Sequence, residues 1–218
     1  MGNAIPIAQL AVFLGCLTLA AWIAGISYGK DRGLAFWAGA LTCFAVVYGF
    51  LSFELPMGPI FSVVLANVAL ACTLALLAEC VLCWQNRRSL HGWVKLPVMV
   101  AIAGFLMLQD DPRGRIMLGA AVFASQSLLI LMLLLQKRKQ LRSTVLYLVE
   151  IGAALIACLF VLRAVFTLSG RQDVHPLVVS DHVQASTLLL SVISVMLLGL
   201  GFELLGGSMG DNEQTVET

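Results

Sequence analysis

Residues 116–136, IMLGAAVFASQSLLILMLLLQ, form an apolar stretch that contains no charged side chain. About 20 residues of α-helix cross the ~30 Å hydrocarbon core of a bilayer, so this stretch is long enough to span a membrane. In hydrocarbon an unpaired backbone amide is costly, which favours a helix. Six other stretches have the same character, and the predicted spans are Ile5–Gly29, Gly33–Leu51, Met57–Trp84, Trp93–Leu108, Ile116–Gln136, Thr144–Leu168 and Ala185–Leu205.

These spans leave no room for a soluble domain. Of the 218 residues, 60% are hydrophobic and 11% are charged, and the mean hydropathy is +0.96. We therefore expect an all-α membrane protein, a bundle of seven transmembrane helices in which the fourth is short. Residues 1–205 form the one predicted domain. The acidic tail 206–218 has nothing to bury and is expected to be disordered.

The basic residues in the short connections predict the orientation. Nine of them follow the first, third and fifth spans or lie close by, whereas the other connections carry only Arg113, Arg115 and Arg171. Because positive charge in short loops stays in the cytoplasm, we expect the N-terminus outside and the C-terminus in the cytoplasm of a multi-pass inner-membrane protein. Loop charge of this kind gives no reason to expect nucleic-acid binding.

Polar side chains inside the spans are the candidate functional residues, because they are costly in lipid and usually face the bundle interior. They are Asn67, Gln126, Ser191 and Ser194 near mid-membrane or slightly outside it, and Tyr48 and Arg163 nearer the outer surface. Thr187, Ser191 and Ser194 share one helix face by their spacing. The set predicts an outward-facing ligand pocket with one cationic anchor. The alternative, favoured for the serine stripe and Gln126, is hydrogen bonding between helices.

Arg163 is the most informative single residue, and two interpretations of it remain open. Its side chain either reaches out to the headgroups, or it binds an anionic ligand or a carboxylate such as Glu54. A second group, Glu79, Glu150 and Glu203, lies toward the cytoplasmic ends of its spans. These carboxylates are either proton sites or, as we favour, partners of the nearby Arg87, Arg88 and Arg142.

Other chemistries find no support in the sequence. All six cysteines fall inside predicted spans, and Cys80-x-x-Cys83 is interpreted as packing rather than as a redox or metal pair, because no further ligands are adjacent. The last span carries no lysine for a retinal Schiff base, since all four lysines lie at inner interfaces, and the three histidines lie outside the membrane core that a bis-histidine haem would need. No nucleophile–base motif or phosphate loop occurs. We therefore predict no catalytic residues, no metal ligands and no cofactor.

Several stretches, taken in order, resemble the seven-helix membrane sensory regions that precede GGDEF domains in bacterial diguanylate cyclases. They are GLAFWAGALTCFAVVYGFLSFELP (33–56), SVVLANVALACTLALLAE (62–79), FVLRAVFTL (160–168), VQAS (183–186) and GLGFELL (199–205). The resemblance covers nearly the whole chain and places Trp37, Asn67 and Arg163 where such regions are expected to carry Trp, Asn and Arg. It implies a sensing site coupled through the seventh helix to a cytoplasmic output domain.

The chain departs from that pattern after the seventh span, where Gly206 and Gly207 are followed by the acidic tail rather than by a cyclase. The chain is then either an excised sensor domain or a stand-alone relative that acts through a partner in cyclic di-GMP signalling. Our leading expectation is a non-catalytic, dimeric module that binds a small molecule or a lipid. The alternative is a small transporter for a lipophilic or anionic solute, and a membrane redox or lipid-modifying enzyme is the third.

Overall fold

A computed structural model describes residues 4–27, 32–52, 59–85, 87, 91–108, 110–136, 144–168, 193–194, 197–198 and 201. Across these ranges there are six helices and no strand. The helices are α1 (Ala4–Ser27), α2 (Arg32–Ser52), α3 (Pro59–Trp84), α4 (His91–Met107), α5 (Pro112–Gln136) and α6 (Thr144–Leu168). The all-helical prediction is confirmed for this part of the chain, and each of the first six predicted spans corresponds to one helix.

Three of the helices contain segments that are long and apolar enough to cross a membrane: Arg32–Phe50, Val64–Trp84 and Arg113–Gln136. Apolar segments of the other three are shorter, and α4 has only 17 residues, so the fourth helix is indeed the short one. The predicted seventh span lies mostly outside the described residues. Its positions 193–194, 197–198 and 201 are helical, and we refer to them as the last segment.

The start of α5 differs from the sequence prediction by one turn. The helix begins at Pro112 instead of Ile116, so Arg113 and Arg115 belong to it. The Asp111 carbonyl accepts the first helical hydrogen bond, from the Arg115 amide at 3.0 Å. Proline at the first helical position has a suitable fixed φ and lacks only an amide that would be unpaired there. This proline, rather than the first apolar residue, therefore sets the start of α5.

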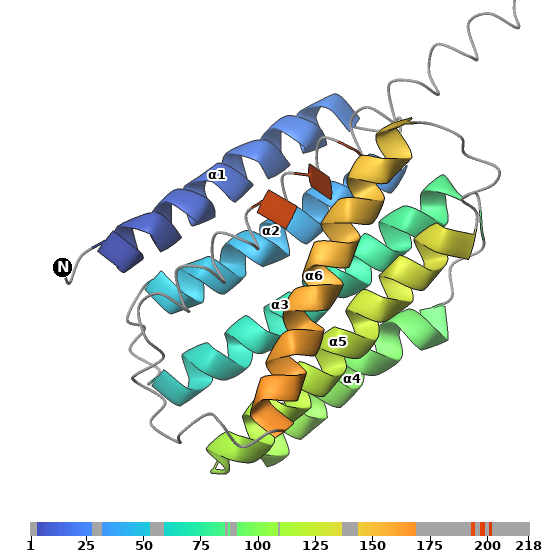
Figure 1. Ribbon diagram of the computed structural model, residues 1–218. Helices are drawn as coiled ribbons and strands as arrows, with labels where there is room; N and C mark the ends of the chain where they lie inside the picture. Colours follow the sequence, from blue (N-terminus) through green and yellow to red (C-terminus); the bar gives the residue numbers. More distant parts are fainter. Residues whose placement is uncertain are drawn as a thin grey trace, which may run out of the picture.

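The helices run up and down in a bundle, with sequence neighbours antiparallel (Figure 1). α3 lies at the centre and packs against α2, α4 and α5, while α1 covers α2 and α6 covers α5. Both α2 and α3 bury small residues, Ala38 and Ala45 on α2 and Ala71 and Ala78 on α3. Small side chains let helix backbones approach closely, which is the usual basis of packing in lipid.

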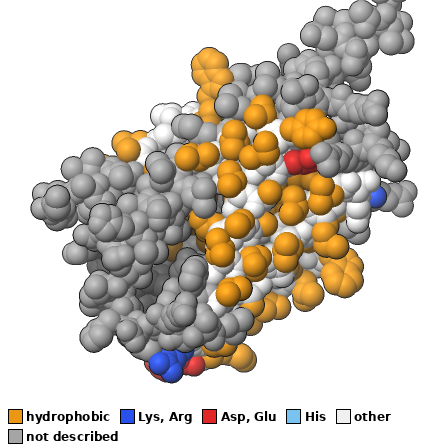
Figure 2. Space-filling model, viewed as in Figure 1, with side chains coloured by type: hydrophobic (Ala, Val, Ile, Leu, Met, Phe, Trp, Pro, Cys, Tyr) orange, Lys and Arg blue, Asp and Glu red, His pale blue; other side chains and the backbone are white. Residues whose placement is uncertain are grey.

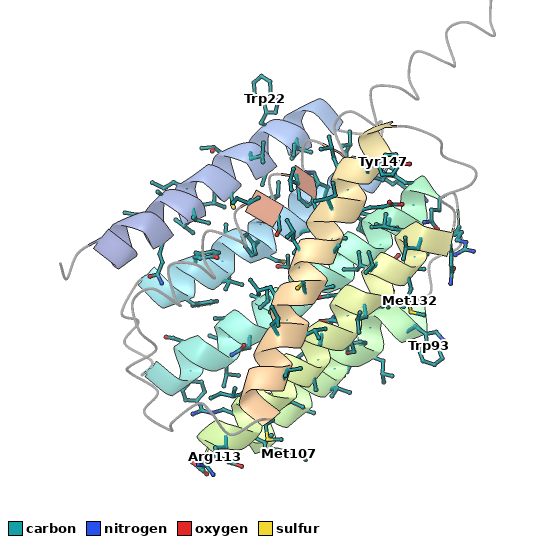
Figure 3. The ribbon with its side chains drawn as sticks, in the orientation of Figure 1. Trp22, Trp93, Met107, Arg113, Met132 and Tyr147 are labelled. Atoms are coloured by element: carbon teal, nitrogen blue, oxygen red, sulfur yellow. The ribbon has the colours of Figure 1, made fainter. Side chains whose placement is uncertain are left out.

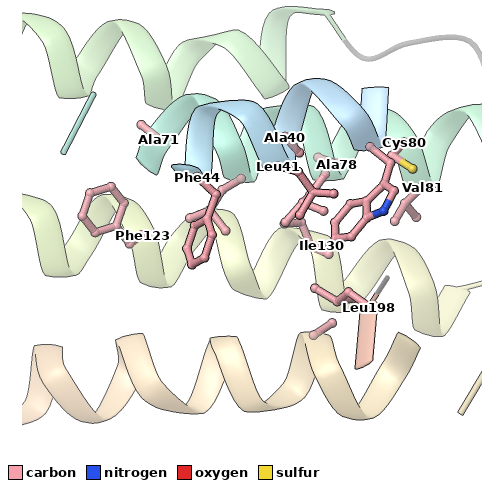
Figure 4. Packing of buried hydrophobic residues seen from close by; sticks show 14 of the residues in the cluster. Ala40, Leu41, Phe44, Ala71, Ala78, Cys80, Val81, Phe123, Ile130 and Leu198 are labelled. Atoms are coloured by element: carbon pink, nitrogen blue, oxygen red, sulfur yellow. The ribbon is translucent and has the colours of Figure 1, made fainter. Parts of the chain in front are cut away.

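The centre of the bundle is mainly apolar, with Leu41, Val81 and Leu198 among its most buried side chains (Figure 4). The outer surface is apolar as well. On the face shown in Figure 2, hydrophobic side chains cover most of the described area, and Lys and Arg appear only near its edges. A helix that is hydrophobic all round needs an apolar environment on its outer side too. The surface therefore agrees with the membrane-spanning lengths of α2, α3 and α5.

The connection after α3 is fastened to the end of α5. Gln85, which is buried, donates a hydrogen bond from Nε2 to the Leu133 carbonyl at 2.6 Å, and Arg87 donates from Nη1 to Gln136 Oε1 at 2.9 Å. Leu133 is among the last four residues of α5, whose carbonyls have no partner within the helix. The bond from Gln85 thus satisfies one of these carbonyls and fixes the two helix ends to each other.

Candidate functional site

Gln126 is the clearest polar group inside the bundle. It is 3% exposed, and its Nε2 donates to the Ala71 carbonyl of α3 at 3.1 Å. Its Oε1 is buried and accepts no hydrogen bond within the described part of the chain. The expected role in joining helices is therefore present on the nitrogen side of the amide. On the oxygen side, an unsatisfied acceptor costs about 1–3 kcal/mol, so this oxygen would gain from a further donor.

Tyr48 and Asn67 lie near Gln126 in the helix register. Gly39 of α2 faces Leu76 of α3, with 3.5 Å between a Cβ built on the glycine and the leucine side chain. Tyr48 lies nine residues after Gly39, and Asn67 lies nine residues before Leu76. Because the two helices are antiparallel, Tyr48 and Asn67 therefore lie at the same level of the bundle. Asn67 and Ala71 share a face of α3 by their spacing. Tyr48 is buried and packs edge-on against Phe44, with ring centroids 5.1 Å apart.

Trp37 does not belong to this group. It lies eleven residues before Tyr48 on α2, which is about 16 Å along the helix axis. Its side chain is 1% exposed and forms part of the apolar core. The structure therefore places Trp37 at a different depth from the other candidate residues on α2 and α3.

Ser194 belongs to a close contact between α6 and the last segment. A Cβ on Gly152 of α6 would lie 3.0 Å from the Ser194 carbonyl oxygen and 3.2 Å from the Leu198 amide nitrogen. A Cβ on Gly201 would meet the side chain of Val149 and would lie 3.3 Å from the Val149 amide nitrogen. Going from Gly152 back to Val149 along α6, the contact moves forward along the last segment, from Ser194 and Leu198 to Gly201. The last segment is therefore antiparallel to α6 and nearly in backbone contact with it.

Arg163 lies within α6, but its side chain is outside the described residues, and Ser191 lies outside them entirely. The helix position of Arg163 is still informative. It is eleven residues from Gly152, which is three turns, and so the two positions share one face of α6. The ring contact between Phe123 and Phe160, at 5.2 Å, sets the register of α5 and α6. Position 163 is then about 9 Å beyond Gln126 along the bundle.

One small cavity lies among the described residues at the junction of α3, α5, α6 and the last segment. Its volume is about 10 Å³, and its lining is Leu77, Val81, Ser127, Ile130, Ala153, Ile156 and Leu198. Ser127 donates its hydroxyl hydrogen to the Phe123 carbonyl at 2.6 Å. A volume of this size holds at most about one water molecule. The lining of this cavity includes none of the predicted polar residues Tyr48, Asn67, Gln126 and Ser194.

The remaining candidates are consistent with packing. All six cysteines are free, Cys80 is buried, and Cys83 is half-buried. No group of three or more metal-binding side chains occurs among the residues that the structure describes. Glu150 is buried on α6, and Glu203 lies outside the described residues.

The glycine contact between α6 and the last segment was missed at the level of sequence. Its only signal was the presence of Gly152 and Gly201 within strongly apolar stretches, where small residues often mark close helix pairs.

No family model matches the chain, and no curated protein or solved structure matches it either.

Proposed function

We propose that the chain is a non-catalytic sensory module of a bacterial inner membrane that passes a signal from its interior to the cytoplasm through its last span. The observation that carries the proposal is a pair of near-backbone contacts: Gly152 of α6 meets the last segment, and Gly201 of the last segment meets α6. Packed interfaces of this kind shift between discrete arrangements rather than deform smoothly. A displacement of α6 would therefore be transmitted to the last segment.

Arg163 provides the link to a ligand in this proposal. It occupies the α6 face that, at Gly152, packs against the last segment. Helical spacing counted back from Ser194 predicts that Ser191 and Thr187 lie on the same side of the seventh span. A ligand with a carboxylate or phosphate would bind Arg163 and the hydroxyls of this stripe. Asn67, Gln126 and Tyr48, on the neighbouring helices, would contribute further hydrogen bonds.

The output in this proposal is a cytoplasmic GGDEF-type domain or a separate partner, with the module acting as a homodimer. Support comes from the sequence resemblance and from the loop charges, which favour a cytoplasmic C-terminus. The module itself needs neither a catalytic residue nor a cofactor for this task, because its contribution is a change in helix packing.

The orientation gives the first prediction. A reporter that is active only in the cytoplasm is expected to be active when fused after Thr218 and inactive when fused before Met1, because nine basic residues favour one side of the membrane. Activity of both fusions would mean an even number of spans and would contradict the seven-helix arrangement.

A second prediction distinguishes a sensor from the alternative transporter. Single cysteines replace Asn67, Gln126 or Ser194 in a protein that lacks its native cysteines, and a membrane-impermeant thiol reagent is added to one side at a time. A sensor exposes these sites to one side at most, whereas alternating access exposes them to both sides in turn. Arg113→Cys, at an exposed position near a helix end, is the control for labelling. Labelling of Gln126→Cys from both sides would overturn the sensory proposal.

A further inference from the structure

The exposed tryptophan and tyrosine side chains lie at one end of the bundle. Trp22 on α1, Trp93 on α4 and Tyr147 on α6 are 67%, 69% and 52% exposed. Figure 3 shows all three at the end where α1, α3 and α5 terminate, opposite Met107 and Arg113. We call this the aromatic end. No other described tryptophan or tyrosine is exposed, since Trp37 and Tyr48 are buried and Trp84 is half-buried.

These three rings lie at the depth of a membrane interface. From Tyr147 to Val165, α6 rises about 27 Å, close to the ~30 Å hydrocarbon thickness. Among the described side chains between them on α6, the exposed ones are apolar: Ile151, Ala154, Cys158 and Leu162. Tryptophan and tyrosine prefer the headgroup level because one part of the ring is apolar and the other can donate a hydrogen bond. The aromatic end thus has the side chains of a headgroup contact.

The exposed charges differ between the two ends. Arg32, Arg87 and Lys95, at the helix ends and connection that form the aromatic end, are exposed, and the described acidic residues of this end are not. At the opposite end, Asp110 and Asp111 are exposed beside Arg113. Around the aromatic end the most exposed described charges are therefore positive, whereas Glu79 is half-buried and Glu150 is buried, which suits an anionic surface.

Arg87 is already oriented by the protein. The hydrogen bond from its Nη1 to Gln136 Oε1 uses one of the five N–H donors of the guanidinium. The bond from Gln85 to Leu133 fixes the chain two residues earlier. The remaining donors of an arginine can bind two phosphate oxygens at once. Lys95, two residues after Trp93 on α4, adds a second exposed cation at nearly the same depth.

We propose that the aromatic end binds the headgroups of anionic phospholipids, with Arg87 and Lys95 contacting phosphate and with Trp22, Trp93 and Tyr147 at headgroup depth. Membrane lipid is the occupant rather than a soluble anion, because the basic groups border the apolar surface of the helices. The proposal goes beyond the sensory function and stands without it, since it requires neither a ligand in the bundle nor an output domain.

The test measures lipid contact at Trp93. Trp22 and Trp84 are replaced by phenylalanine, while Trp37 is retained because it is 1% exposed and out of reach of lipid. The protein is placed in phosphatidylcholine bilayers, and quenching by brominated phosphatidylglycerol is compared with quenching by brominated phosphatidylcholine. We expect at least a fivefold preference for phosphatidylglycerol, and bromine close to the headgroup should quench more than bromine near the chain end.

Arg87→Gln is expected to lower this preference about fivefold, as about 1 kcal/mol per basic residue near an anionic surface implies. Lys95→Gln should act in the same direction and leaves the described hydrogen bonds of the fold untouched. The matched control, Arg113→Gln at the opposite end, should leave the preference unchanged. Three results would overturn the proposal: equal quenching by both lipids, a preference that survives both variants, or displacement of phosphatidylglycerol by inorganic phosphate.

Discussion

Gly152→Leu is expected to destabilise the protein by about 1–3 kcal/mol, the usual cost of inserting bulk into a packed interior. Two of the three nearest obstacles to a Cβ at this glycine are backbone atoms, the Ser194 carbonyl oxygen at 3.0 Å and the Leu198 amide nitrogen at 3.2 Å, and the third is the Leu198 Cγ at 3.0 Å. Backbone atoms cannot move aside by a change of rotamer, so the whole last segment must shift. The free energy of unfolding in detergent, measured by SDS titration, reports the loss.

The matched control for Gly152→Leu is Ala154→Leu. Ala154 is exposed on the same helix, so the added bulk meets no neighbour in the described structure and the change should stay within about 0.5 kcal/mol. Equal stability of the two variants would mean that α6 and the last segment do not approach as closely as the glycines indicate. It would also remove the structural basis for a signal that passes from α6 to the last span.

The helices were predictable because, in lipid, the backbone has few conformations other than a helix that satisfy its hydrogen bonds. Apolar stretches of about 20 residues indicated each of the first six helices, and the bounds differ from the expected ones by a few residues. α5 shows the limit of this reasoning: hydropathy places its start at Ile116, whereas Asp111 and Pro112 start the helix one turn earlier. A helix start depends on local backbone chemistry, which an apolar count does not measure.

The candidate site was predictable only in part, for a related reason. Asn67 and Gln126 are conspicuous in the sequence because polar groups are rare in apolar helices. Which of them meet depends on helix register, and register is set by contacts such as Gly39 with Leu76 that no hydropathy pattern records. Trp37 illustrates the same point, since the resemblance grouped it with Asn67 and Arg163 whereas it lies about 16 Å from Tyr48 along α2.

Arg163→Lys is expected to leave folding and membrane insertion intact but to weaken binding of an anionic ligand at least tenfold, about 1.4 kcal/mol. A lysine reaches the headgroups as well as an arginine does, so a residue that only extends toward them tolerates the change. An arginine that holds a carboxylate or phosphate through two parallel hydrogen bonds does not, because the ammonium group is a point charge without a planar pair of donors. Arg163→Ala should lose more.

Octanoate and dodecyl phosphate serve as probes of this site, one a carboxylate and the other a phosphate, and their affinities are measured for the parent and for each variant in detergent. Arg113→Lys is the control, since Arg113 is an exposed arginine in the first turn of α5, outside the proposed pocket. This variant should bind both probes as the parent does. The α6 position of Arg163, three turns from Gly152 on the face that meets the last segment, is the reason to expect a difference. Equal binding by the parent and by Arg163→Lys would show that Arg163 is an interfacial charge and not an anchor. The proposed signal from a ligand bound on α6 to the last span would then lose its anchor residue.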